Sequence, residues 1–305
     1  MNDIQKRILL EVADLHKVPE GAYNIRSDGQ SAGRRSTEHI EITSKTDVSG
    51  IDVRIAPGTR NESVHIPVVL SQSGLKETVY NDFYIGEDCD VLIVAGCGIH
   101  NCGNQDSQHD GVHRFFVGRG AKVRYVEKHY GEGDGLGKRL LNPVTEVYQE
   151  PDSTVEMEMV QIRGVDSTKR VTTAELAEGS RLLVKERLMT HGRQNAVSVY
   201  RVALNGAGSS ADVVNRSVAR DESYQEFDAC ISGNAPCHGH TECDSIIMDK
   251  GRILAEPKLE ANDVDAELIH EAAIGKIAGE QLVKLMTLGL TEAEAEEQII
   301  NGFLK

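Results

Sequence analysis

The sequence contains no tryptophan, and aromatic residues make up only 4% of its 305 positions. A wide core filled by bulky rings is therefore disfavoured, and a slender core of aliphatic side chains fits the composition better. The length suits either two average domains or one long all-β unit such as a solenoid or barrel. Length alone does not choose between these arrangements.

Positive charge is also scarce, with 33 basic against 48 acidic residues and a net charge of -15. This excess of negative charge disfavours nonspecific binding to nucleic acid or to an anionic membrane. No run of about 18 apolar residues occurs anywhere in the chain. The N-terminal segment is interrupted by charged residues, so it does not resemble a signal peptide. We therefore expect a soluble, cytoplasmic protein.

A repeated pattern of short alternating strands and small-residue turns begins near residue 38. The apolar residue that follows each turn recurs at Val91, Val123, Val155, Leu182 and Ala211, with spacings of 32, 32, 27 and 29 residues. This loose period predicts a β-solenoid whose stacked coils bury a continuous aliphatic core. A β-sandwich with irregular hairpins is the alternative.

Helical periodicity appears only at the two ends of the chain. Residues 1–37 predict one short amphipathic helix and a polar linker, and residues 38–263 form the expected β-helix core. Residues 264–305 predict two helices, the first ended by Gly289 and the second opened by a capping box at Thr291. This last segment is acidic, which is typical either of a solvated face or of a dock for a basic partner.

The first group of candidate ligands lies between residues 97 and 113. Its thiols and imidazoles are Cys97, His100, Cys102, His109 and His113. Such groups bind zinc or iron, and clustered cysteines in a reducing compartment indicate metal or redox chemistry more readily than disulfides. The spacing matches no standard zinc finger, so a polar corner of the solenoid with hydrogen-bonded histidines is the alternative.

The second group begins at Cys237 and includes His240 and Cys243. Strand alternation would place Cys237 and Cys243 on the same side of one strand. Downstream, His270 and Glu271 fall at the expected start of the terminal helix, where the helix dipole favours a carboxylate. A thiolate, an imidazole and a carboxylate from these segments predict a site for iron.

The stretch from Glu242 to Lys305 carries several short motifs: Cys-Asp-Ser, His-Glu-Ala, Gly-Glu-Gln-Leu, Gly-Leu-Thr-Glu and Ile-Ile-Asn-Gly-Phe. In these it resembles the C-terminal core of the SufB/SufD family, the scaffold proteins of the SUF iron-sulfur assembly system. The resemblance implies a right-handed parallel β-helix that holds an iron-sulfur cluster. Position by position, it makes Cys243 the assembly cysteine and Glu271, next to His270, the essential carboxylate.

The resemblance also implies partners. Family members dimerise through their β-helices, and their terminal helices dock the SUF ABC-type ATPase, a role that would fall here to residues 264–304. Compact SufB-like proteins resemble this chain most, because the larger N-terminal region and the C-terminal extension of the longer scaffolds are not seen in it. We therefore expect a homodimer that passes clusters to apo acceptor proteins and has no substrate turnover of its own.

Two other functions stay open on the sequence. One is a zinc- or redox-sensing adaptor built on residues 97–113. The other is a carbohydrate-active β-helix enzyme that uses surface carboxylates as acid and base. The scarcity of aromatic residues to stack against sugars, and the presence of the cysteines, count against the enzyme.

Overall fold

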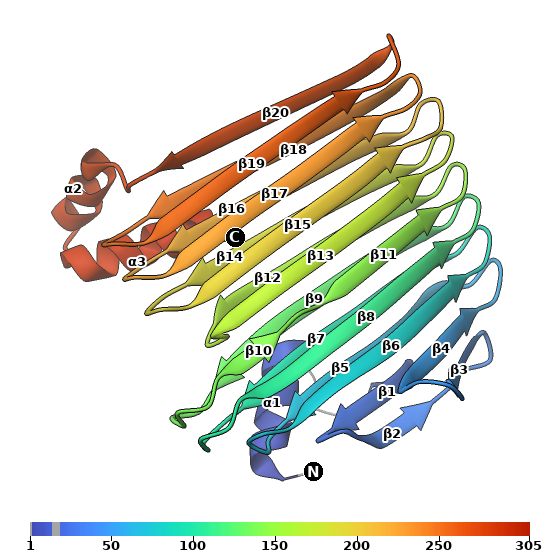
Figure 1. Ribbon diagram of the computed structural model, residues 1–305, viewed down its shortest axis with the longest axis horizontal. Helices are drawn as coiled ribbons and strands as arrows, with labels where there is room; N and C mark the ends of the chain where they lie inside the picture. Colours follow the sequence, from blue (N-terminus) through green and yellow to red (C-terminus); the bar gives the residue numbers. More distant parts are fainter. Residues whose placement is uncertain (1, 14–18) are drawn as a thin grey trace.

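The computed structural model describes residues 2–13 and 19–305. It is a parallel β-helix in which two long sheets face each other and successive coils stack along one axis (Figure 1). Helix α1 (Asp3–Ala13) packs against the N-terminal coils, while α2 (Gly279–Thr287) and α3 (Glu292–Phe303) lie beside the C-terminal coils. This confirms the predicted all-β solenoid with a short N-terminal helix and a C-terminal helical pair.

Each of the two sheets takes roughly one strand from every coil. The first sheet contains β1 (Ala22–Ser27), β2 (Gln30–Arg35), β5 (Arg60–Leu70), β7 (Asp90–His100), β9 (Lys122–Glu132), β12 (Thr154–Arg163), β14 (Arg181–Thr190), β16 (Ser210–Ala219), β18 (Cys237–Ile247) and β20 (Ala266–Gly275). The second contains β3 (Ile40–Ser44), β4 (Gly50–Ile55), β6 (Lys76–Ile85), β8 (Ser107–Val117), β10 (Arg139–Leu141), β11 (Val144–Gln149), β13 (Ser167–Leu176), β15 (Asn195–Leu204), β17 (Tyr224–Gly233) and β19 (Arg252–Ala261).

The repeat in the sequence is the coil length of the solenoid. The five apolar residues that marked it, from Val91 to Ala211, are consecutive neighbours in the register of the first sheet, and none is more than 3% exposed. The preceding turns hold Asp88, Gly120, Asp152, Gly179 and Gly208 at φ 53°, 66°, 62°, 63° and 70°. Glycine and aspartate recur there because a left-handed backbone costs them less than other residues.

The segment expected to be a linker is instead a β-hairpin, so that prediction was wrong. Strands β1 and β2 pair antiparallel through a turn at Asp28 and Gly29, which have φ values of 49° and 79°. Strand β1 also pairs parallel with β5, so the first sheet begins at residue 22. An Asp-Gly pair between two strands is a hairpin signal that the polar composition of the segment concealed.

The first terminal helix, predicted from residue 264 to Gly289, was wrong in its first half, because residues 266–275 form strand β20. This strand pairs parallel with β18 over its whole length, and α2 begins only at Gly279. His270 and Glu271 therefore lie in mid-strand, and no helix dipole acts on Glu271. The capping box of α3 is confirmed, since the Thr291 hydroxyl accepts from the Glu294 amide and the Glu294 carboxylate accepts from the Thr291 amide.

Candidate functional site

Cys243 lies on β18 and points into the interior of the β-helix. It is 2% exposed and belongs to the same core cluster as Cys237, which confirms that the two cysteines share one side of the strand. Its Sγ lies 3.7 Å from Ser245 Oγ and 3.9 Å from Asn215 Oδ1. Burial raises the pKa of the Cys243 thiol, so the free thiol is protonated at neutral pH.

Glu271 lies on the next strand of the first sheet but on its outer face. Its register partner is Glu242, and Cys243 is paired instead with Ala272. The Glu271 carboxylate lies 3.7 Å from His240 Nε2, and His240 Nδ1 lies 2.9 Å from Asp212 Oδ1. Because alternate residues of a strand project to opposite faces, His240 and Glu271 are together outside the β-helix while the Cys243 thiol is inside.

His270 occupies the inward column of β20, as the register partner of the buried Thr241. Strand β20 is last in its sheet, so no further strand covers this column. Every residue of β20 from Ile269 to Gly275 is exposed, with Ile269 at 49% and Ile274 at 41%. The coil that carries His270 and Glu271 is thus the open end of the β-helix, one strand away from Cys243.

The group at residues 97–113 does not converge on one point. Cys97, His109 and His113 are buried, whereas His100 and Cys102 lie at a corner of the solenoid. There the Cys102 Sγ is 3.0 Å from His100 Nε2, and His100 Nδ1 is 2.8 Å from Glu132. Across residues 2–13 and 19–305, no group of three or more histidine, cysteine or acidic side chains is arranged to hold a metal ion.

A network of buried charges, which was not predicted from the sequence, lies between the two sheets. Glu127 on β9 is fully buried and forms an ion pair with Arg170 on β13. Arg170 Nε lies 3.2 Å from Glu186 Oε1 on β14, and Asn215 Nδ2 donates to Glu186 Oε2 over 2.8 Å. The alternation in residues 122–132 places Glu127 inward, and that signal alone could have pointed to it.

This network reaches Cys243 along a single inward column of the first sheet. Glu127 is paired with Met159, Met159 with Glu186, Glu186 with Asn215, and Asn215 with Cys243. Met159 is the one apolar member of the column. Polar groups thus extend through the core from the middle of the solenoid to the candidate assembly cysteine. Apolar side chains in their place would cost less free energy to bury.

Cys97 lies at the N-terminal end of the same network, with its thiol facing two histidines. Burial raises its pKa, but the positive charges and hydrogen bonds of His109 and His129 outweigh burial and lower the pKa to about 7. Burial lowers the pKa of His109, yet the Cys97 thiolate and Glu77 raise it to about 10. At neutral pH the interior therefore holds a partly ionised thiol, the form that acts as a nucleophile and metal ligand.

Comparison with known protein families shows to which family the chain is related. The family model described as "SUF system FeS cluster assembly, SufBD core domain" matches residues 81–303. The chain belongs to the SufBD family. The match confirms the resemblance found in the motifs of residues 242–305, and it extends that resemblance back to β6, through most of the β-helix.

Similar SufBD family proteins of iron-sulfur cluster assembly occur in several archaea. One from Methanothermobacter thermautotrophicus (strain Winter) is 29% identical over 265 residues, which cover 85% of this chain and 63% of that protein. One from Archaeoglobus fulgidus is 27% identical over 272 residues, 88% of this chain and 71% of that protein. One from Pyrococcus horikoshii is 27% identical over 287 residues, 92% and 86% of the two chains. The chain thus spans less than two thirds of the length of the Methanothermobacter relative.

Proposed function

We propose that this SufBD protein is a scaffold on which iron-sulfur clusters are assembled and from which they pass to apo acceptor proteins, without substrate turnover of its own. The observation that carries the proposal is the position of Cys243, one strand inside an uncovered coil that presents His270 and Glu271. Thiolate, imidazole and carboxylate are the ligands that iron accepts. The cluster is the cargo of this site.

A second copy of the chain would complete the site in this proposal. Strand β20 is a sheet edge with exposed apolar side chains, and such edges pair readily with another strand. A homodimer joined there would bring two Cys243 thiols and two Glu271 carboxylates to one junction. In such a homodimer, the outer-face Glu271 of one copy would lie beside the inward-facing Cys243 of the other copy. Groups on opposite faces of the first sheet would then contribute to one cluster.

For the ABC-type SUF ATPase, helix α2 is the part of the terminal pair best suited to docking. It has no buried residue, and it exposes Val283 at 60% and Met286 at 42%, followed by its C-cap Leu288 at 75%. Helix α3, in contrast, packs Ile300 against Val218 of the solenoid, together with the adjacent Leu304. We therefore assign the apolar anchor of the dock to α2 and the structural attachment to α3.

Anaerobic reconstitution with iron and sulfide tests the scaffold proposal. We expect Cys243→Ser to lose most of the bound iron and sulfide, and Glu271→Gln to lose a large part of it, while both variants keep the parental melting temperature. Cys230→Ser serves as the matched control, because Cys230 lies on β17 away from the candidate ligands. If Cys243→Ser bound as much iron and sulfide as the parent and Cys230→Ser, the assignment of Cys243 as a cluster ligand would be rejected.

The zinc- or redox-sensing adaptor is the second candidate, and the lowered pKa of Cys97 favours it. Zinc binding distinguishes the two functions. An adaptor would bind zinc through Cys97, so Cys97→Ser would abolish zinc binding and Cys243→Ser would leave it unchanged. A scaffold instead loses iron and sulfide with Cys243→Ser, whatever its affinity for zinc.

A further inference from the structure

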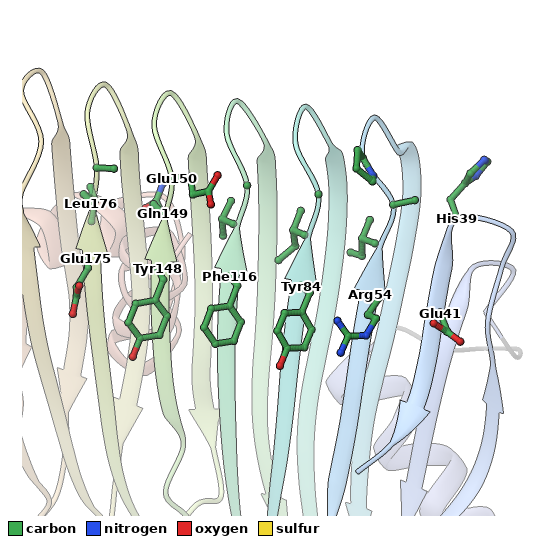
Figure 2. Close-up of a pocket in the computed structure, with 18 of the residues that line it drawn as sticks. His39, Glu41, Arg54, Tyr84, Phe116, Tyr148, Gln149, Glu150, Glu175 and Leu176 are labelled. Atoms are coloured by element: carbon green, nitrogen blue, oxygen red, sulfur yellow. The ribbon is translucent and has the colours of Figure 1, made fainter. Parts of the chain in front are cut away.

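A row of stacked aromatic rings lies on the outer face of the second sheet, far from Cys243 in the chain. Tyr84, Phe116 and Tyr148 are consecutive register neighbours on β6, β8 and β11 (Figure 2). Their ring centroids are 5.1 and 5.3 Å apart, with interplanar angles of 10° and 9°. Phe116 and Tyr148 are each 37% exposed although the composition is poor in aromatic residues.

These rings form the floor of a groove with a cavity volume of about 790 Å³. The groove crosses six successive strands of the second sheet, from Glu41 on β3 to Glu175 on β13. At a strand spacing of about 4.8 Å, six strands span roughly 24 Å, which is the length of about seven residues of extended peptide at about 3.3 Å each.

The rim of the groove is acidic. Glu38, Glu41, Glu150 and Glu175 line it and are all exposed. The carboxylates of Glu41 and Glu175 make no hydrogen bond or ion pair with any residue in the described part of the chain. The two basic groups that line the groove are already engaged: His39 Nδ1 lies 2.6 Å from Glu62, and the Arg54 guanidinium stacks 4.4 Å from the Tyr84 ring centroid.

The stacking decides which chemistry the floor offers. The ring planes are nearly parallel while neighbouring centroids are more than 5 Å apart, so the rings stack with an offset, and Phe116 and Tyr148 each keep an edge and part of a face open to the groove (Figure 2). An incoming apolar or aromatic side chain can pack against the ring edges, a favoured geometry for aromatic pairs. A second copy of this chain, at net charge -15, and a nucleic acid would both be repelled by the acidic rim.

We propose that this groove binds an extended segment of a partner protein in which lysine or arginine residues alternate with apolar residues. The apolar side chains lie over the edges of Phe116 and Tyr148, and the cationic side chains pair with the carboxylates of Glu41 and Glu175. Glu41 and Glu175 stand at the two ends of the register row that holds the three rings, so cationic residues on either side of an apolar one reach a carboxylate while the apolar side chain covers the rings. This interaction is separate from cluster assembly and does not depend on it.

Fluorescence anisotropy of two labelled octapeptides tests the inference on the full-length protein. One peptide alternates lysine and phenylalanine, and the other alternates glutamate and phenylalanine. We expect the lysine peptide to bind the parent, more weakly as salt is added, and the glutamate peptide not to bind. Phe116→Ser and Glu175→Lys should each weaken binding of the lysine peptide by at least tenfold, roughly the effect of losing one good contact.

Two variants outside the groove are the matched controls. Ile162→Ser removes an apolar side chain of similar exposure (38%) from β12, and Glu156→Lys reverses an exposed carboxylate on the same strand. Both should bind like the parent. Equal binding to all variants, or equal binding of both peptides, would overturn the inference. So would a Phe116→Ser variant that changes the sedimentation mass of the protein and leaves peptide binding intact, because the groove would then join two copies of the chain.

Discussion

At the scale of single residues, Glu127 and Arg170 bury two opposite charges inside the β-helix. Their side chains are at most 3% exposed, and each charge would be costly to bury alone. A well-packed apolar pair would be at least as stable in that position. The ion pair is therefore weak evidence for stability and stronger evidence that the interior must be polar along the column leading to Cys243.

Replacing Glu127 with glutamine should destabilise the protein by about 3 kcal/mol at pH 7, since Arg170 would keep its buried charge with Glu186 as its remaining carboxylate partner. Burial raises the pKa of Glu127, but Arg170 and then His129 outweigh it and hold the pKa well below the ordinary 4.5. Because the folded pKa is depressed, this stabilisation is fully present above pH 4.5 and is lost as the pH falls through the folded value.

Chemical unfolding of the parent and Glu127→Gln at pH 7 and at about pH 3 measures both effects. The difference between the two proteins should be smaller at the lower pH. Glu156→Gln is the control, because Glu156 is exposed on the outer face of the first sheet and should change stability by less than about 0.5 kcal/mol. A difference that grows on acidification would contradict the depressed pKa.

The two groups of site residues were not equally predictable. Cys243 and Glu271 were recognised because short motifs surround them, but their opposite faces follow only from the register of β18 with β20. The charge network was invisible because Glu127, Arg170 and Glu186 come from three different strands. His100 and Cys102 were grouped with Cys97 by sequence distance, although the chain leaves the strand at His100 and carries Cys102 to the surface.

At the scale of elements, the alternating strands were predictable wherever one face of the strand is buried and the other is exposed to solvent. Strand β20 was not, because the spacing of Ile269, Ala272 and Ala273 also fits a helix, and pairing with β18 decides the outcome. The β1–β2 hairpin was hidden for a similar reason. Its two strands carry few apolar residues, and β1 is held in the sheet by β5, a neighbour that no local pattern reveals.

The terminal helices give a prediction that separates docking from folding. A double variant, Val283→Ser with Leu288→Ser, removes one exposed apolar side chain from α2 and one from its C-cap, and should abolish capture of the ABC-type SUF ATPase. The melting temperature should not fall, because neither side chain is buried. Affinity capture with the purified ATPase, at low and high salt, is the measurement.

Leu136→Ser is the matched control for this variant, since Leu136 is 86% exposed on the loop between β9 and β10, in the middle coils of the solenoid. It should capture the ATPase like the parent. Parental affinity in the α2 double variant would place the dock elsewhere on the molecule. Within the described residues no helix is long and apolar enough to cross a membrane.

For the whole molecule, the solenoid follows from three features of the sequence: the aliphatic composition, the alternating strands, and a turn that recurs once per coil. These features fix stacking along one axis and a continuous core between two sheets. They do not fix what happens at the last coil, where β20 has no neighbour beyond it. That open end carries the residues on which the proposed function depends.

Native mass spectrometry of the anaerobically reconstituted protein measures subunit number and bound cluster in the same species. We expect a mass equal to two chains plus iron and sulfide, and the loss of that added mass in Cys243→Ser. Iron and sulfide on a single chain, or a reconstituted protein of two chains without added mass, would contradict a cluster assembled at the junction of two copies.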